Sequence, residues 1–169
     1  MIKIKKPKTD KAITTDMTLA GETFEIDLMP LTEEERLNIF KTFRKRRNIL
    51  NPISKQMEVI SYFDDDDPKF QKAADDLLDK VIVDFRGLGE EENPDNPTGK
   101  LIPLDGTLRE NKLLIGSVKV KEIEEIPIVD ENGQTANIKQ PRERYFRTLI
   151  LDKAVELSQA TAEAETKNL

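Results

Sequence analysis

The sequence contains no cysteine and no histidine among its 169 residues. Without cysteine the chain can form neither a disulfide bond nor a thiolate metal site. Without histidine it lacks the most common general base of enzymes and a frequent zinc ligand. Together with the candidate residues considered below, these absences lead us to expect a protein that is not an enzyme and uses no cofactor or metal.

Long apolar runs are also missing from the sequence. No run approaches the roughly 20 residues that a membrane-spanning helix needs. The first eleven residues, MIKIKKPKTDK, lack the apolar core of a secretory signal. We therefore expect a soluble cytoplasmic protein with no membrane partner.

Charge is abundant and unevenly distributed. Charged residues make up 36% of the chain and hydrophobic residues 37%, which predicts a modest core and long exposed helix faces. Lysines crowd into residues 1–11 and Arg44–Arg47 form a second basic run, whereas residues 64–95 hold twelve acids and four bases, a difference of -8. This asymmetry favours encounter with charged partners, although solubility alone explains it equally well.

The two basic runs also raise the question of nucleic-acid binding, because lysine and arginine side chains contact phosphates. An isoelectric point near 5.0 and the lack of interleaved aromatic residues argue against it. A solvated tail at residues 1–11 and a helix end complemented by Arg44–Arg47 explain the runs better. Nucleic acid is therefore an unlikely partner.

The segment 12–29 has the alternation of a β-hairpin. Phe24, Ile26 and Leu28 fall on one face with polar residues between them, and Gly21 lies in the turn that precedes them. This segment is the only clear β element that the sequence predicts.

A helix is predicted from Thr32, because Thr32 and Glu35 have the spacing of a capping box. We expect it to continue through the basic run Arg44–Arg47 and to end before Asn51-Pro52. Its buried stripe is predicted to consist of Leu37, Ile39, Phe40 and Phe43.

The next segments are also predicted to be helical. Residues 53–63 fit helical spacing but end in β-branched and aromatic residues typical of a strand, and we favour the helix. A long amphipathic helix is predicted over residues 68–85, with Asp67 as its N-cap, and Gly87 and Gly89 as its terminators. Its apolar face comprises Phe70, Ala73, Ala74, Leu77, Leu78, Val81, Ile82 and Phe85.

The rest of the chain contains shorter elements. We expect a loop over residues 88–100, a short strand over 101–104 and a helix over 106–116 capped by Asp105. Residues 118–134 are mixed. They contain a turn at Asn132-Gly133, and a final helix is predicted to start near Pro141.

The sequence thus predicts a mainly α fold with a small N-terminal β-hairpin (α+β), in which four to five helices pack in one domain. We expect this domain to span residues 12–157. A disordered basic tail at residues 1–11 and a flexible C-terminal tail at residues 158–169 are predicted to flank it.

No candidate chemical site withstands inspection. The run Asp64–Asp67 fails the EF-hand pattern, because Lys69 occupies the position that requires glycine. The carboxylates of Asp75, Asp76 and Asp79 are expected to be solvated on a helix face, which is poor placement for acid–base catalysis. The pair Gly87 and Gly89 follows a helix instead of a strand, which is the wrong order for a phosphate loop.

The segment 78–114 nevertheless has a particular order of features. An apolar helix leads to Phe85-Arg86-Gly87, then to an acidic loop, then to Leu-Ile-Pro-Leu and finally to Glu-Asn-Lys-Leu-Leu. This order resembles the tail assembly chaperones of long-tailed bacteriophages and prophages, and residues 12–116 are covered by the resemblance. Two features depart from that family: Phe85 stands where tryptophan is common, and the acidic excursion over residues 88–99 is long.

The resemblance implies a protein that binds phage tail tube or tape-measure proteins in the cytoplasm of the host bacterium without catalysis. If exposed, Phe40, Phe43 and Phe85 are the candidate partner-binding anchors, and core packing is the alternative role for each. Two other functions remain open from the sequence: a virion structural component of the tail or connector, and an acidic regulatory or nucleic-acid-associated protein.

Overall fold

The computed structural model describes residues 11–51, 53–91, 95, 101–129 and 131–167. In these residues helices and strands contribute about equally, so the fold is α+β and the prediction of a mainly α fold was wrong. The difference arises largely because four stretches predicted to be helical pair as strands: residues 44–50, 57–63, 82–85 and 141–145. Strand pairing depends on a partner strand, which the helical spacing within a single segment does not reveal.

The predicted N-terminal hairpin is confirmed as β1 (Ile13–Leu19) and β2 (Glu22–Leu28). Ala20 and Gly21 both have positive φ, as a tight type I′ hairpin turn requires. A third strand, β5 (Ile82–Arg86), pairs antiparallel with β2 and completes the sheet β1-β2-β5.

The helix predicted at Thr32 begins where expected but is short. In α1 (Glu33–Phe40) the hydroxyl of Thr32 accepts a hydrogen bond of 3.1 Å from the Glu35 N–H. A 3₁₀ turn, η1 (Lys41–Phe43), then leads into a strand, so the prediction that the helix continues through the basic run was wrong. The predicted buried stripe is also corrected, because Leu37 and Ile39 are exposed.

The basic run lies on β3 (Arg44–Leu50), which pairs with β4 (Met57–Phe63). The helix favoured for residues 53–63 is therefore a strand. The turn between the strands is built by Asn51, whose side-chain oxygen accepts hydrogen bonds from the N–H groups of Ile53 and Ser54. Such side-chain-to-backbone bonds favour turns over helices.

The amphipathic helix is confirmed as α2 (Pro68–Val81), and Asp67 caps it by accepting from the Lys69 N–H. It ends four residues earlier than predicted, because the chain turns into β5 at Ile82. Gly87 and Gly89 are consequently not helix terminators. The buried residues of α2 agree with the predicted face: they are Phe70, Ala74, Leu77, Leu78 and Val81.

A small hairpin of β6 (Gly89–Glu91) and β7 (Leu101–Pro103) follows, and β7 confirms the predicted short strand. Of the predicted loop 88–100, residues 92–94 and 96–100 lie outside the described part of the chain. The next helix, α3 (Leu108–Gly116), is capped by Thr107 in a reciprocal capping box with Glu110, instead of by Asp105.

The last elements are a long hairpin and a long helix. Strands β8 (Lys119–Val129) and β9 (Thr135–Tyr145) pair along their full lengths around the predicted turn at Asn132-Gly133. Helix α4 (Phe146–Lys167) therefore starts five residues after Pro141, which lies on β9. It also runs through most of the segment for which we expected a flexible tail.

The core lies between the sheet β1-β2-β5 and the helices α2, α3 and α4. The rings of Phe24 and Phe146 pack with centroids 6.0 Å apart. The N–H of Leu31 donates to the Ala154 carbonyl oxygen at 3.1 Å, which fixes the start of α1 to α4. Gly116 brings α3 close to Leu78 of α2 and to α4.

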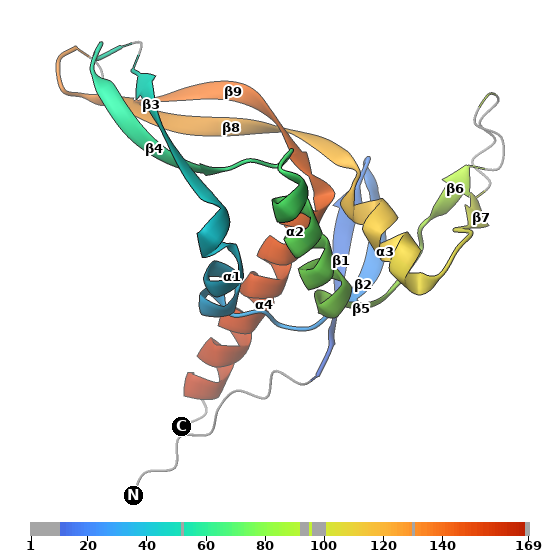
Figure 1. Ribbon diagram of the computed structural model, residues 1–169. Helices are drawn as coiled ribbons and strands as arrows, with labels where there is room; N and C mark the ends of the chain where they lie inside the picture. Colours follow the sequence, from blue (N-terminus) through green and yellow to red (C-terminus); the bar gives the residue numbers. More distant parts are fainter. Residues whose placement is uncertain (1–10, 52, 92–94, 96–100, 130, 168–169) are drawn as a thin grey trace, which may run out of the picture.

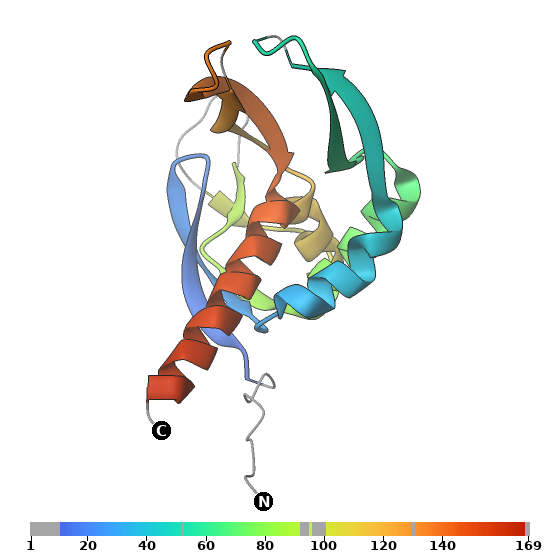
Figure 2. The same ribbon diagram turned by 90° about the vertical axis from the view of Figure 1, so that its left-hand side faces the viewer.

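Two hairpins extend from this body. Figure 1 shows β3–β4 and β8–β9 leaving the helices on one side, while β6–β7 leaves on the other. Figure 2, turned by 90°, shows β3–β4 and β8–β9 on either side of the upper part of the molecule. Within the described residues, β3–β4 and β8–β9 are each a two-stranded sheet that pairs with no other strand.

Candidate partner-binding site

One face of the β3–β4 hairpin is exposed along its whole length. Because directly paired residues share a face, the register places Arg44, Arg46, Asn48 and Leu50 of β3 beside Met57, Val59, Ser61 and Phe63 of β4. All eight side chains are exposed. We call this set of eight residues the arm face.

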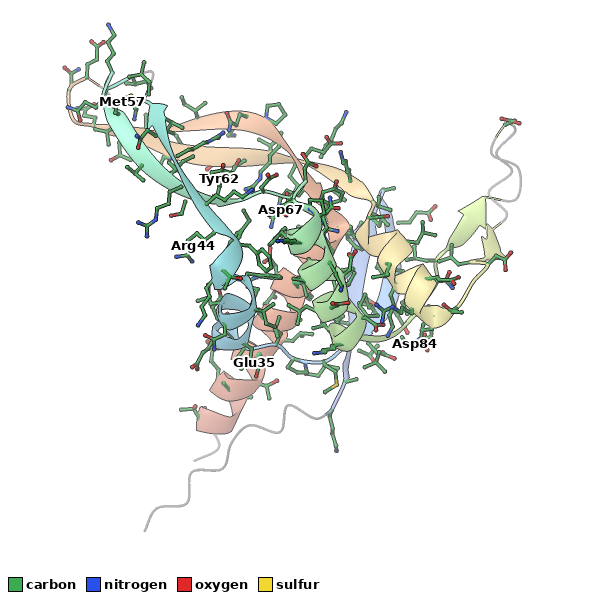
Figure 3. The ribbon with its side chains drawn as sticks, in the orientation of Figure 1. Glu35, Arg44, Met57, Tyr62, Asp67 and Asp84 are labelled. Atoms are coloured by element: carbon green, nitrogen blue, oxygen red, sulfur yellow. The ribbon has the colours of Figure 1, made fainter. Side chains whose placement is uncertain are left out.

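The arm face carries an unusual concentration of exposed apolar residues. Leu50, Met57 and Val59 are 60%, 65% and 68% exposed, and Phe63 is 37% exposed. Figure 3 shows Met57 near the far end of the hairpin and Asp67 where the chain enters α2. Clustered apolar side chains on a protruding element are typical of an interaction surface.

The opposite face of the hairpin fixes it to the body. The ammonium group of Lys45 lies 3.2 Å from a carboxylate oxygen of Asp64 and 3.7 Å from one of Asp67. These two acids belong to the aspartate run at the start of α2. The run is therefore part of the connection between the hairpin and the helix.

At the base of the hairpin, four phenylalanines form a cluster. Phe63 stacks on Phe70 with centroids 5.5 Å apart and the rings nearly parallel. Phe40 lies 5.2 Å from Phe70, and Phe43 lies 5.9 Å from it. The cluster joins the arm face to the buried core.

The candidate anchors predicted from the sequence are only partly brought together. Phe40 is buried and Phe43 is half-buried in the phenylalanine cluster. Phe85 is half-buried on β5, opposite Ile26 in a different sheet. The exposed apolar residues Leu50, Met57 and Val59 were not predicted, although Met57, Val59 and Phe63 follow the two-residue period of a strand.

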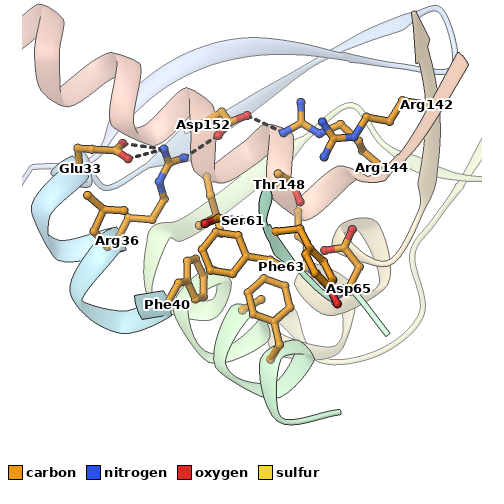
Figure 4. A pocket seen from close by; sticks show the side chains of 16 residues that line it. Glu33, Arg36, Phe40, Ser61, Phe63, Asp65, Arg142, Arg144, Thr148 and Asp152 are labelled. Atoms are coloured by element: carbon orange, nitrogen blue, oxygen red, sulfur yellow. Dashed lines mark hydrogen bonds and ion pairs between the residues drawn. The ribbon is translucent and has the colours of Figure 1, made fainter. Parts of the chain in front are cut away.

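Beside the cluster lies a cavity of about 380 Å³, lined by residues of α1, β4, α2, β9 and α4. Phe40, Phe63 and Phe70 form an apolar wall. The facing wall is polar and includes the three arginines Arg142, Arg144 and Arg147. Figure 4 shows Asp152 between Arg36 and Arg144, with Phe40 and Phe63 below them.

A chain of ion pairs crosses the polar wall. Asp152 accepts from Arg36 at 2.6 Å and from Arg144 at 2.9 Å through its two oxygens. Arg36 also pairs with Glu33 at 2.6 Å, and Arg144 with Glu122 at 3.4 Å. The network therefore connects α1, α4 and the β8–β9 hairpin.

Some polar groups at the cavity have no partner within the described residues. Arg147, whose side chain is 5% exposed, donates from Nη1 to Asp75 at 3.2 Å, but its Nη2 has no acceptor. The Nε of Arg144 is also buried without an acceptor. Buried N–H groups of this kind are rare in proteins, because each unmade hydrogen bond costs free energy.

Asp65 lines the same cavity from the turn that precedes α2. Burial raises the pKa of its carboxyl, and the positive charges of Arg147, Arg142 and Arg144 oppose this effect only in part. In the part of the chain that the structure describes, its carboxylate forms no ion pair. The cavity thus holds a carboxylate and guanidinium N–H groups that do not satisfy one another.

The β8–β9 hairpin forms the other side of this region. Arg142 pairs across the strands with Glu124 at 2.9 Å. Ile123 is 75% exposed and Ile138 is partly exposed. The second hairpin therefore also presents apolar side chains, but more widely spaced than those of the arm face.

The structure offers no alternative chemical centre within the residues it describes. Among the residues that the structure describes, no three carboxylates lie close enough together to hold a metal ion. Asp75, expected to be solvated, is ion-paired with Arg147, and Asp79 accepts from Arg109 and Lys112. Across the described ranges, no helix has both the length and the apolar composition that crossing a membrane requires.

Comparisons with known proteins add no further constraint. No protein-family model, no curated protein and no solved structure matches the chain.

Proposed function

We propose that this protein is a bacteriophage or prophage tail assembly chaperone. It binds tail tube or tape-measure protein in the cytoplasm of the host bacterium and catalyses no reaction. The observation that carries this proposal is the arm face, which presents four exposed apolar side chains on a hairpin that extends from the body. The sequence resemblance over residues 12–116 supplies the identity of the client.

The arm face has the properties that holding an assembly subunit requires. Leu50, Met57 and Val59 are available to cover apolar surface that the client exposes before it assembles. Each fully covered side chain of this size contributes about 1.5–3 kcal/mol. Because the residues lie on a hairpin outside the core, they can be used for binding without disturbing the fold.

The arm face also selects by charge. Arg44 and Arg46 are exposed on the same face as the apolar residues. An acidic client surface is therefore favoured, and its association should be faster at low salt.

A virion structural component of the tail or connector is the second candidate function. The two extended hairpins favour it, because such elements can also hold subunits together permanently. A stable oligomer formed by the purified protein, and its presence in mature particles, would support this function over that of a chaperone.

The test of the chaperone function is co-expression with the tube and tape-measure proteins encoded in the same gene cluster, followed by co-purification. The arm variant is Met57→Gln combined with Val59→Thr, which preserves side-chain shape and strand preference but removes apolar surface. The control is Leu108→Gln combined with Leu114→Gln, two exposed leucines of α3 that lie outside the arm face.

We expect a complex with the wild-type chain and with the α3 control. The arm variant should bind at least about tenfold more weakly, since a loss of 1.4 kcal/mol corresponds to a factor of ten. The proposal fails if no complex forms with either client, or if the arm variant binds as tightly as the control.

A further inference from the structure

We propose that the cavity at the base of the arm face binds an extended polypeptide segment of the client. An apolar side chain of the segment packs against Phe40, Phe63 and Phe70, and one of its peptide groups lies between Asp65 and Arg147. This inference rests on the proposed function for the identity of the client, but the chemistry of the site can be tested without it.

The unsatisfied groups of the cavity define what the ligand must supply. Arg147 Nη2 and Arg144 Nε are buried without a hydrogen-bond acceptor among the described residues, and the Asp65 carboxylate, which lines the cavity, forms no ion pair there. A peptide group carries both, a carbonyl oxygen and an N–H, on adjacent atoms. It therefore complements the two sides of the cavity at once.

The charges of the cavity argue against an anion as the ligand. The four guanidinium groups of the polar wall are paired with five carboxylates: Glu33 and Asp152 for Arg36, Asp152 and Glu122 for Arg144, Glu124 for Arg142, and Asp75 for Arg147. No net positive charge is left over, and the Asp65 carboxylate would repel a negative group. A neutral amide avoids this repulsion.

The strands that line the cavity also favour a polypeptide. Ser61, Tyr62 and Phe63 belong to β4, and Arg142 and Arg144 belong to β9. Within the described residues, β4 pairs only with β3, and β9 only with β8. Each strand therefore has a free edge whose backbone groups can pair with an added extended segment.

The arm face leads directly into the cavity. Met57, Val59, Ser61 and Phe63 alternate along β4, and the last two of them line the cavity. An extended segment lying along the hairpin would therefore place one side chain at the phenylalanine wall. The cavity volume of about 380 Å³ is within the usual range for ligand sites.

The experiment uses the full chain and a defined probe, the blocked peptide acetyl-Thr-Phe-Thr-amide. Binding is measured by two-dimensional NMR titration of the ¹⁵N-labelled protein. The control probe is acetyl-Thr-Gly-Thr-amide, which has the same backbone but no aromatic side chain. A third probe, acetyl-phenylalaninate, tests whether a carboxylate is preferred to an amide.

Two variants locate the binding. Ser61→Trp places a bulky side chain at an exposed position that lines the cavity. Asn137→Trp makes the same change on β9, at an exposed position that belongs neither to the arm face nor to the cavity lining. Because both positions are exposed, both variants should fold, and their NMR spectra will show whether they do.

We expect the phenylalanine peptide to shift the signals of Phe63, Asp65 and Arg147 in the wild type and in Asn137→Trp. Binding should be at least tenfold weaker for the glycine peptide and for Ser61→Trp. The proposal is overturned if the phenylalanine peptide causes no shifts at these residues, if Ser61→Trp binds it normally, or if acetyl-phenylalaninate binds more tightly than the peptide.

The outcome is separable from that of the proposed function. If the peptide binds but no tail protein co-purifies, the cavity binds polypeptide and the phage assignment is wrong. If the client complex forms but the peptide does not bind, the chaperone function stands and the cavity is not its docking site.

Discussion

Arg86 donates two parallel hydrogen bonds, each 2.9 Å long, from its guanidinium group to the two carboxylate oxygens of Asp27 on the neighbouring strand. A further contact of 3.2 Å joins Arg86 to Glu25. Paired bonds of this geometry are among the stronger ion pairs in proteins. They connect β5 to β2, the pairing that completes the sheet beneath the core.

This ion pair predicts a specific dependence of stability on pH. The hydrogen bonds from Arg86 and then from Thr14 lower the pKa of Asp27 to about 2, below its ordinary value of 3.8. Since the pKa is lowered in the folded state, the stabilisation is fully present above pH 3.8 and is lost as the pH falls through about 2.

We expect Arg86→Gln to reduce the free energy of unfolding at pH 5 and the difference from the wild type to shrink toward pH 2. Urea unfolding at a series of pH values measures this. Arg46→Gln is the control, because Arg46 is exposed and forms no ion pair among the described residues. A difference between Arg86→Gln and the wild type that stays constant from pH 5 to pH 2 would contradict the assignment.

Gly116 predicts a second stability effect. A Cβ atom at this position would meet Leu78 Cδ2 at a distance that real atoms do not adopt, and Arg147 Cβ at 3.2 Å. Gly116→Ala should therefore lower stability by about 1–3 kcal/mol through overpacking. At an ordinary helix position the same change raises stability, so a higher melting temperature would show that α3 does not pack as described.

The phenylalanine cluster predicts unequal costs for its members. Phe70 is buried and contacts three other rings, whereas Phe63 is 37% exposed. Phe70→Ala should cost about 3–5 kcal/mol, and Phe63→Ala clearly less. Chemical denaturation of both variants measures the difference, and equal losses would mean that Phe63 belongs to the core and not to the arm face.

The capping box of α3 gives a further prediction. Thr107 accepts from the Glu110 N–H at 3.2 Å, and the Glu110 side chain accepts from the Thr107 N–H at 3.2 Å. Thr107→Ala should cost about 1 kcal/mol, whereas Thr107→Ser retains the hydroxyl and should cost little. If the two variants have the same melting temperature, the hydroxyl contributes nothing to α3.

The parts of the fold that could be predicted from the sequence are those with local causes. Gly21 and the alternation around Phe24 define the first hairpin, and Asp67-Pro68 defines the start of α2. The end of α2 could not be located in this way. Ile82 and Phe85 keep the helical spacing of the apolar face, yet they point inward from a strand because β5 pairs with the distant strand β2.

The same reasoning explains what was missed at the candidate site. Arg44–Arg47 suit the end of a helix by charge, but their conformation is fixed by pairing with β4 across the Asn51 turn. The exposed face of that hairpin could not be recognised while both segments were assigned to helices. The cavity was also beyond prediction, because its walls come from five separate elements.

The position of α4 in the fold has a consequence for synthesis of the protein on the ribosome. Phe24 packs on Phe146, and the backbone of Leu31 is bonded to that of Ala154. One apolar face of the N-terminal hairpin therefore stays uncovered until the ribosome has synthesised α4. A nascent chain halted before Phe146 should accordingly remain protease-sensitive, and resistance should appear only when α4 has left the exit tunnel.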